Sequence, residues 1–434
     1  MQRATGGDMA EDTARGAAAR LVHNVIAGDQ SLSDQLAAGQ LAALSPADRA
    51  RAQRLALTTL RNIARADRVL KPYLRKPPPA EIRAILRVAV SELFSDQAAA
   101  HGVVGQAVDL ARRSGPKGAA FAPMVNAVLR RVAETPPDVW ASADPQELPG
   151  WLRGRLMSAW GKKATMAMEA AHARGAPLDL TPRDGDAGAL ARRLGGVALP
   201  TGSVRLADAG QVSDLPGYAE GDWWVQDAAA ALAVQVLAPR PGERILDLCA
   251  APGGKTLQLA AAGADVTALD LSAQRMARLE ENLARCRLAA RTVVADALTW
   301  QPDAPFDAIL LDAPCSATGT IRRHPDLPYL RDAEGMKAVF ALQSALLDHA
   351  AGLLRPGGRL VFATCSLLPE EGERQVDALA ARGTPLVPDS AAPAPDGISA
   401  EWRHQGHGLR LRPDYWPDSG GMDGFFIARL TRPA

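Results

Sequence analysis

Two cysteines stand in polar turns that follow predicted strands, Cys315 in the run DAPCS and Cys365 in the run TCS. A buried cysteine is usually a small apolar core residue, and we assign that role to Cys286, which lies inside a predicted helix. Ligands of open α/β sheets bind at the carboxyl ends of the strands. We therefore expect the thiols of Cys315 and Cys365 to be within reach of a substrate.

Thiols at such an edge suit covalent catalysis on a pyrimidine ring. Carbon 5 of cytosine is too electron-poor to attack a sulfonium methyl group, but addition of a thiolate to carbon 6 makes carbon 5 nucleophilic. Protonation of ring nitrogen 3 by a neighbouring acid would assist the addition, and loss of the carbon 5 proton after methyl transfer would let the cysteine leave. Positive charge favours the thiolate, and we expect Arg322, Arg323 and His324 to supply it.

A glycine-containing turn, DLCAAPGGKT from Asp247 to Thr256, lies between a predicted strand and the next helix. Glycine lets the backbone approach a ligand closely, and the first N–H groups of a helix bind electronegative atoms. The run is neither GxGxxG nor GxxxxGK[ST], which argues against dinucleotide and P-loop sites. The alternative is an ordinary strand-to-helix turn.

Three carboxylates follow successive predicted strands, namely Asp270, Asp296 and Asp312. Asp270 lies 23 residues beyond Asp247, close to the interval of about 20 residues at which an acidic residue binds ribose hydroxyls in this topology. Asp296 is placed to accept a hydrogen bond from an adenine amino group. Each Asp alone could simply cap the next turn, but together they predict a cofactor that carries a nucleoside.

The pattern of elements divides the chain into three predicted parts. Residues 1–135 are helical almost throughout, and residues 136–220 are a Pro-rich linker and a small α+β subdomain. Residues 221–434 alternate apolar strands with amphipathic helices, which is typical of a doubly wound α/β sheet. The predicted strands are Arg244–Cys249, Asp265–Leu271, Arg291–Ala295, Phe306–Asp312 and Gly358–Cys365, followed by an antiparallel pair at Gly408–Leu411 and Gly424–Leu430.

Two helices of the first part have clear sequence signals. Ser45 is a typical N-cap, and Pro46 suits the first helical position of a helix that we expect to end near Lys71. From Ala80 to Phe94 the apolar residues fall on one stripe. The charged residues Arg83, Arg87 and Glu92 lie away from that stripe.

The composition is that of a globular protein, with 47% hydrophobic and 22% charged residues among 434. The sequence has no apolar run of membrane-spanning length, and the start MQRATGGDMAEDTARG lacks the apolar core of a signal peptide. We therefore expect a cytoplasmic protein without a membrane partner. The four cysteines are widely spaced and form no CxxC pair, so we predict neither disulfides nor a metal site.

Four runs carry a family resemblance: DLCAAPGGKT, LLDAPCSATGTIRRHPD, ATCSLLPEEGE and the terminal MDGFF. They resemble the RsmB/Sun (Fmu) family of 16S rRNA cytosine-C5 methyltransferases, with a highly specific match from about Trp223 to the end. The helical first part is similar in layout to the NusB-like RNA-binding domain of that family. The resemblance implies a multidomain protein with an all-α NusB-like domain, a small α+β middle domain and a Rossmann-like class I methyltransferase domain.

The resemblance also implies roles for individual residues. The cysteine of the TCS motif, Cys365, would be the nucleophile, Cys315 would aid release of the methylated product, and Asp312 would lie near the cytosine ring. The cofactor would be S-adenosylmethionine, and the partner of the monomeric enzyme would be RNA. The implied cofactor contacts are Cys249, Ala250, Ala251, Pro252, Gly253, Gly254, Lys255, Asp270, Asp296 and Asp312.

One segment departs from the family pattern. Family members commonly carry an Asn- and Pro-rich segment ending in Leu-Arg-x-Asn before the catalytic domain, whereas this chain reads AHARGAPLDLT from Ala171 to Thr181. The resemblance therefore does not imply that residues Ala171 to Thr181 contact RNA.

Other functions remain open on the sequence alone. Transfer RNA is the main competitor as substrate, and a non-catalytic NusB-like RNA-binding protein is a different class of answer. A DNA cytosine methyltransferase would use the cysteine of the PC motif with a downstream Glu-Asn-Val motif, which the sequence lacks. A small-molecule methyltransferase would need neither the helical domain nor paired cysteines.

The helical part also offers contacts for RNA phosphates. A pocket that reads one flipped or unpaired base needs further RNA contacts to select its site. A solvated helix face is the alternative for each basic residue. The candidates are Arg112, Arg113, Lys117, Arg130 and Arg131.

Overall fold

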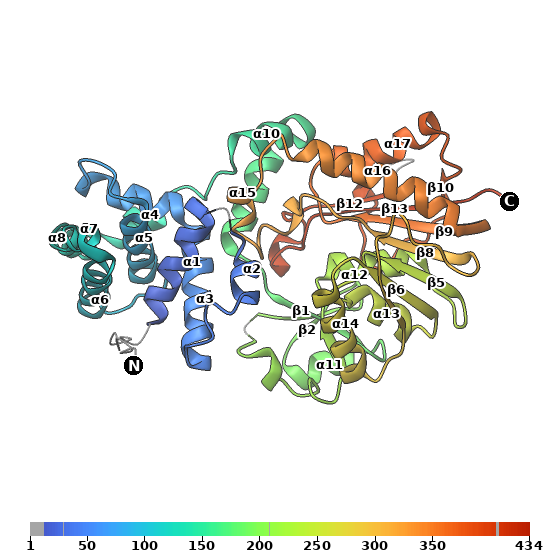
Figure 1. Cartoon of the computed structure of the whole chain (residues 1–434), viewed down its shortest axis with the longest axis horizontal. Coiled ribbons are helices and arrows are strands. Elements are labelled where there is room, and N and C mark those ends of the chain that lie inside the picture. The colour runs from blue at the N-terminus through green and yellow to red at the C-terminus, as the bar shows by residue number, and fades with distance from the viewer. Residues whose placement is uncertain (1–12, 29, 208, 405–407) are drawn as a thin grey trace, which may run out of the picture. The chain divides into compact units, whose positions relative to one another are not determined.

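The computed structural model describes residues 13–28, 30–207, 209–404 and 408–434. The sequence predicts no signal peptide at the polar start of the chain. Residues 1–12, which make up most of this start, lie outside the described residues. Two compact units result (Figure 1): one runs to Pro149 and includes His324–Arg331, and the other comprises Gly150–Arg323 and Asp332–Ala434.

The first unit is all-helical, which confirms the predicted class of this part. Its longer helices pack around α5 (Ala80–Ser95), which contacts α1, α3, α6 and α8. The other helices are α1 (Ala14–Gly28), α2 (Leu32–Ala37), α3 (Pro46–Arg61), α4 (Ile63–Leu70), α6 (Ala100–Arg113), α7 (Gly115–Ala119), α8 (Ala122–Ala133), α9 (Pro137–Ala141) and α15 (Leu327–Leu330), with a short 3-10 turn at Lys71–Tyr73.

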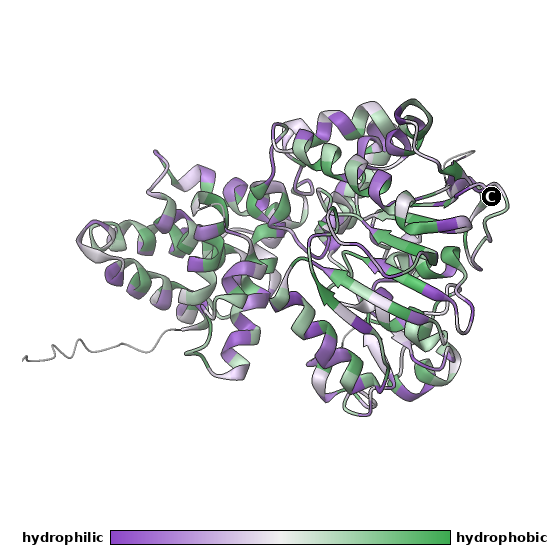
Figure 2. Ribbon diagram, turned by 45° about the vertical axis from the view of Figure 1, so that its right-hand side comes forward, coloured by the Kyte–Doolittle hydropathy of each residue, from purple (hydrophilic) through white to green (hydrophobic). Residues whose placement is uncertain are grey.

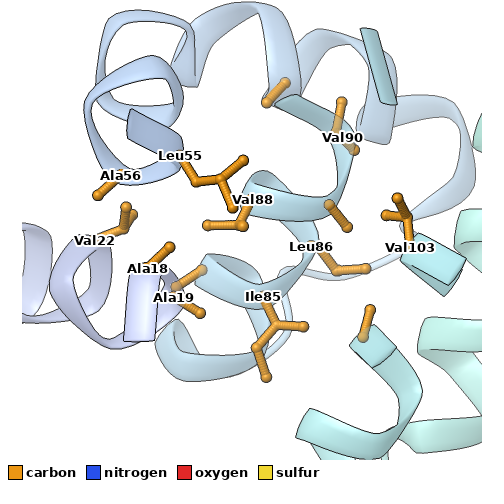
Figure 3. Packing of buried hydrophobic residues seen from close by; sticks show 14 of the residues in the cluster. Ala18, Ala19, Val22, Leu55, Ala56, Ile85, Leu86, Val88, Val90 and Val103 are labelled. Atoms are coloured by element: carbon orange, nitrogen blue, oxygen red, sulfur yellow. The ribbon is translucent and has the colours of Figure 1, made fainter. Parts of the chain in front are cut away.

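Small and branched apolar side chains form the core of this unit. Figure 3 shows Ala18 and Val22 of α1 facing Leu55 of α3 and Val88 of α5. Alanine lets helices approach closely, and the branched side chains fill the space between them. The predicted stripe of α5 is buried in this core.

Two charged residues of α5 that lie off the stripe are nevertheless buried. Glu92 is 1% exposed and forms ion pairs with Arg15 and Arg51, and Arg87 forms one with Asp67. Burial raises the pKa of Glu92, but the hydrogen bonds from Arg15 and Arg51 outweigh it and hold that pKa below its usual range. Helices therefore cover α5 on its polar side as well.

The cap predicted for α3 is confirmed, because the Ser45 side chain accepts a hydrogen bond from Asp48 N. The predicted end near Lys71 is wrong for this helix. Asn62 has φ −123° and ψ 22°, which ends α3 at Arg61 and starts α4 at Ile63.

Residues 136–149, which the sequence assigns to the linker, belong to the helical unit. The Trp140 ring of α9 stacks on Phe94, with ring centroids 5.4 Å apart and an interplanar angle of 10°. The segment His324–Arg331 also belongs to this unit, and Leu32 N donates a hydrogen bond of 2.9 Å to Asp326 Oδ2.

The second unit begins with α10 (Gly150–Arg174), which is kinked at Gly161, and a small antiparallel sheet. In this sheet β1 (Leu178–Pro182) pairs with β3 (Val204–Leu206) and with β4 (Trp223–Val225), and β2 (Val197–Ala198) pairs with β3. α11 (Ala187–Leu194) packs on it through Leu190. The predicted mixture of helix and short strands is confirmed.

The larger sheet confirms the doubly wound prediction. Its parallel strands are β5 (Arg244–Leu248), β6 (Asp265–Asp270), β7 (Arg291–Val294), β8 (Phe306–Asp312) and β9 (Leu354–Thr364). The order across the sheet is β11-β12-β13-β9-β8-β5-β6-β7. The antiparallel part comprises β13 (Phe425–Thr431), β12 (Gly408–Leu411), β11 (Arg403–His404) and β10 (Val387–Pro388), of which β10 pairs with β13 off the main path.

Helices cover both faces of this sheet, whose strands are mostly hydrophobic (Figure 2). Alternate strand residues such as Leu246 and Phe362 pack against α16 (Met336–Leu353) and α17 (Glu373–Arg382). The intervening residues, such as Ile245 and Val361, pack against α12 (Ala228–Leu237) and α13 (Gly254–Ala261). α14 (Ala273–Cys286) contacts α13 and β6.

No helix in the described part of the chain is both long and apolar enough to span a bilayer.

Candidate active site

The glycine turn links β5 to α13 at the carboxyl edge of the sheet. Cys249 and Gly253 adopt positive φ values of 61° and 106°. A Cβ atom added at Gly253 would lie 2.7 Å from Leu279 Cγ, so this position requires glycine for both its conformation and its packing. The turn therefore packs tightly on α14, and α13 begins directly after it at Gly254.

Asp270, at the end of β6, holds this turn in place. Its Oδ2 accepts a hydrogen bond of 3.1 Å from Ala251 N, and its Oδ1 accepts one of 2.9 Å from Ser272 N. A carboxylate has about four acceptor positions. Arg275 Nη1 lies 3.7 Å from Oδ2, and the Asp270 side chain is 3% exposed, so the ribose-binding role stays a prediction.

Asp247, from which the spacing to Asp270 is counted, is fully buried in β5. Thr256 Oγ1 donates a 2.6 Å hydrogen bond to its Oδ2, whereas Oδ1 has no hydrogen-bond partner among the described residues. Burial raises the pKa of Asp247 to about 7, against the opposing effects of Thr256 and Lys255. Asp247 is thus a structural acid beneath the turn.

Asp296 and Asp312 differ in their surroundings. Asp296 is exposed after β7 and accepts a 2.9 Å hydrogen bond from Leu298 N, which is the turn-capping role that the sequence left open. Asp312, 31% exposed at the end of β8, accepts a 2.6 Å hydrogen bond from Lys255 Nζ.

Lys255 places a positive charge beside Asp312 and Asp247. Burial disfavours its charged form, but Asp312, Asp247 and Cys365 together outweigh burial and raise the pKa of Lys255 above its ordinary value. Its Nζ also lies 5.4 Å from the centre of the Phe425 ring. Since Lys255 follows the glycine turn directly, its charge lies near both that turn and Cys365.

The structure brings Cys315 and Cys365 together. Their Sγ atoms lie 3.4 Å apart, and both residues are only partly buried. Gly319 N donates a 2.9 Å hydrogen bond to Cys365 O, and Gly424 N donates one of 2.8 Å to Gly319 O. Backbone bonds thus fix the two cysteine turns against each other and against the MDGFF segment.

The pKa of the Cys315 thiol is raised well above its usual range. The hydrogen bond to Cys365, burial and the negative charge of Glu371 all favour the protonated form. Burial and the charges of Asp312 and Asp270 likewise raise the pKa of Cys249 to about 12. Neither thiol is a ready nucleophile in this state.

Cys286 lies in an apolar cluster with Leu283 and Met276, and its exposed fraction is zero, which confirms the core role predicted for it.

The prediction that Arg322 and Arg323 supply charge to the thiols is wrong. Both guanidinium groups form ion pairs with Asp227 and Asp423, and Arg322 is completely buried. Burial works against the ionisation of Asp227, but the two arginines hold its pKa far below its usual range. Their charge is thus neutralised locally by Asp227 and Asp423.

Glu371, which the sequence did not single out, is completely buried between the two cysteine turns. It lies in the run PEEGE beside Glu370 and Glu373. With three glutamates in five positions, the sequence gives no reason to select Glu371 over the other two.

These groups fit a cationic, nucleoside-bearing cofactor. Asp247, Asp270 and Asp312 lie close enough to raise the pKa of Cys249 together, and a positive charge beside them would lower the cost of their negative charges. A metal centre has no such support, because no group of three or more His, Cys, Asp or Glu within the described ranges could hold an ion.

Comparison with known proteins gives two family matches. Residues 234–431 match the model described as 16S rRNA methyltransferase RsmB/F, and residues 12–134 match that of the NusB family. Two curated relatives are named ribosomal RNA small subunit methyltransferase B. The relative from Pseudomonas putida is 37% identical over 96% of this chain and 98% of its own length, and that from Vibrio cholerae is 35% identical over 96% and 97%.

Solved structures share the fold. The crystal structure of PH0851 is 24% identical, with a TM-score of 0.72 over 96% of this chain and 98% of that one. A methyltransferase homolog protein from Pyrococcus horikoshii is 27% identical, with a TM-score of 0.53 over 64% of this chain and 93% of its own.

Proposed function

Because this chain belongs to the 16S rRNA methyltransferase RsmB/F family, we propose that it methylates carbon 5 of a cytosine in 16S rRNA through a covalent adduct of Cys365. The chain is an RNA methyltransferase, and the methylated position and the adduct are the proposal. The observation that carries it is the 3.4 Å separation of Cys315 Sγ and Cys365 Sγ, within the electrostatic reach of Lys255. A non-catalytic RNA-binding protein would need no such pair.

S-adenosylmethionine is the methyl donor in this proposal, and it supplies an electrophilic methyl group on a sulfonium. Asp270 would bind the ribose hydroxyls, and Asp296 the adenine amino group. The turn from Cys249 to Lys255 would contact the cofactor through its backbone, by way of Cys249, Ala250, Ala251, Pro252, Gly253, Gly254 and Lys255. Asp312, held by Lys255, would lie between the cofactor and the cytosine ring.

The thiolate of Cys365 adds to carbon 6 of the cytosine, with protonation at nitrogen 3, and carbon 5 then takes the methyl group. Lys255, whose pKa is raised in part by Cys365, would place its positive charge near the reacting groups. Loss of the carbon 5 proton to solvent would form the double bond between carbons 5 and 6 and expel the Cys365 thiolate, nitrogen 3 would give up its proton to solvent, and Cys315 would aid this release.

We also propose the wider setting of this reaction. Residues 221–434 would carry the chemistry, residues 150–220 would form a small RNA-binding subdomain, and the helical unit, which runs to Pro149, would bind RNA. The enzyme would act as a monomer in the cytoplasm.

Methylation with a labelled methyl donor tests the site of modification. The purified protein is incubated with S-adenosylmethionine carrying a labelled methyl group and with 16S rRNA or transfer RNA, and the RNA is digested to nucleosides. The proposal expects the label in 5-methylcytidine from 16S rRNA. Label in another nucleoside, or in transfer RNA alone, would refute it.

A further inference from the structure

Glu371 is a buried carboxylate between the turns that carry the two cysteines. It ends the short 3-10 turn Pro369–Glu371, and its exposed fraction is zero. Burying a charged group is costly unless hydrogen bonds compensate for the lost water. The hydrogen-bond partners of its two carboxylate oxygens therefore indicate the role of this buried residue.

Both oxygens bind residues next to the cysteines. Oε1 accepts hydrogen bonds from Ser316 N at 2.8 Å and from Gln343 Nε2 at 3.1 Å. Oε2 accepts from the hydroxyl groups of Ser316 and Ser366. Ser316 follows Cys315 and Ser366 follows Cys365, so one carboxylate holds both turns.

Further hydrogen bonds around Glu371, among them one from the charged Arg410, complete this connection. Leu367 N donates to Thr318 Oγ1 at 3.0 Å, and the Thr318 and Ser366 hydroxyls lie 3.3 Å apart. From the other side, Arg410, which is paired with Glu373, donates to Ser366 O. Hydrogen bonds to an ionised acceptor are roughly twice as strong as neutral ones, so Glu371 is the strongest of the side-chain links between the two turns.

The charge of Glu371 also acts on one of the thiols. It is one of the causes that raise the pKa of Cys315. A second thiolate beside that of Cys365 would repel it and would compete as nucleophile. A negative charge near Cys315 removes that competition by keeping Cys315 protonated.

We propose that Glu371 is a positioning residue that fixes the separation of the two cysteine turns through Ser316 and Ser366, so that Cys365 is placed to add to the substrate. The assignment of the nucleophile rests on the proposed function, whereas the link between the two turns does not.

Three variants separate these effects. Glu371→Gln removes the charge but keeps an oxygen for Ser316 N and a donor for the serine hydroxyls, and Glu371→Ala removes the whole link. Glu370→Gln is the matched control, because Glu370 is the neighbouring carboxylate and forms ion pairs only with Arg155 and Arg374 among the described residues.

The first measurement is the pH dependence of iodoacetamide alkylation of Cys315 in protein that carries Cys365→Ala, with the Cys315 peptide quantified by mass spectrometry separately from that of Cys249. Adding Glu371→Gln should lower the midpoint by about 1 pH unit, since a nearby negative charge is removed. Adding Glu370→Gln should leave it in place. Because this readout needs no RNA, it stays informative even if carbon 5 methylation is not the reaction.

The second measurement is the single-turnover rate of methyl transfer at saturating cofactor and RNA, with Cys365 intact. Glu371→Ala should slow it about 100-fold, as expected for misplaced reacting groups, with unchanged affinity for S-adenosylmethionine. An unchanged thiol midpoint in Glu371→Gln, or a single-turnover rate equal to that of the control in both Glu371 variants, would overturn the inference. A wild-type protein that yields no 5-methylcytidine would instead refute the proposed function.

Discussion

The buried acid Asp247 should make the stability of the protein depend on pH. Its pKa is about 7 in the folded chain against an ordinary value of 3.8, so between these values the folded state binds the proton more tightly than the unfolded state. Stability from this group is therefore greatest below pH 3.8 and declines as the pH rises toward 7. Each unit of pKa difference corresponds to about 1.4 kcal/mol.

Asp247→Asn should remove this decline. We expect the melting temperature of the variant, measured without cofactor, to gain on the wild type from pH 5 to about pH 7 and to level off above it. Asp303→Asn is the control, because the Asp303 side chain is 89% exposed. Parallel melting curves for wild type and Asp247→Asn across this range would contradict the assignment.

At the residue scale, sequence patterns located the thiols but not their electrostatic partners. Cys315 and Cys365 could be placed together because both follow parallel strands, whose carboxyl ends share one edge. The ion-pair partner of an arginine cannot be predicted from the sequence in the same way. Arg322 pairs with Asp227 and Asp423, which lie 95 and 101 residues away in the sequence, so the same charge pattern fits either a thiol neighbour or a buried ion pair.

At the scale of elements, the apolar patterns predicted seven strands of the large sheet to within a few residues, but not the two-residue strands β10 and β11. The largest difference in a strand end is at β9, which begins at Leu354 rather than Gly358, where Arg355 and Gly357 interrupt the apolar run. The helix break at Asn62 was not predictable from periodicity, because neither Pro nor Gly stands there.

The loop between β8 and α15 depends on the buried pairs of Arg322. Arg322 donates to Asp227, Asp423 and Gly420 O. Removing one partner of a buried ion pair leaves uncompensated charge and costs about 3 to 5 kcal/mol. We therefore expect Arg322→Ala to lower the midpoint of urea unfolding strongly.

The matched control is Arg374→Ala, because the Arg374 side chain, which pairs with Glu370, is 66% exposed. Pairs of this kind contribute about 0 to 1 kcal/mol, so its midpoint should change little. Equal midpoints for the two variants would show that the Arg322 cluster does not hold the loop.

At the scale of the whole molecule, the sequence predicted a helical part and an α/β part but not all of their limits. Residues 324–331 lie far along the chain from the helical part, yet Tyr329 and Leu330 pack on its core. Trp140 likewise extends that core into the Pro-rich stretch. Contacts between distant segments leave no local period in the sequence, which is why these additions were missed.

The basic residues of α6 and α8 test the proposed RNA-binding role of the helical unit. Arg112→Glu with Arg130→Glu should weaken RNA binding and lower the slope of log affinity against log salt by about 0.7 to 0.9 for each phosphate that the protein no longer neutralises. Affinity for S-adenosylmethionine should not change. Arg54→Glu, at an exposed position of α3, serves as control.

If the double variant Arg112→Glu/Arg130→Glu shows the same slope of log affinity against log salt as the wild type, Arg112 and Arg130 belong to a solvated helix face and do not bind RNA phosphates.

The most direct test of the account is a denaturing gel of protein mixed with substrate RNA and S-adenosylmethionine. Cys315→Ala should give a slowly migrating protein–RNA band, because Cys365 forms the bond to carbon 6 and release is impaired. Cys365→Ala should give no such band and no turnover. A band with Cys365→Ala and none with Cys315→Ala would contradict the assignment of Cys365 as the nucleophile.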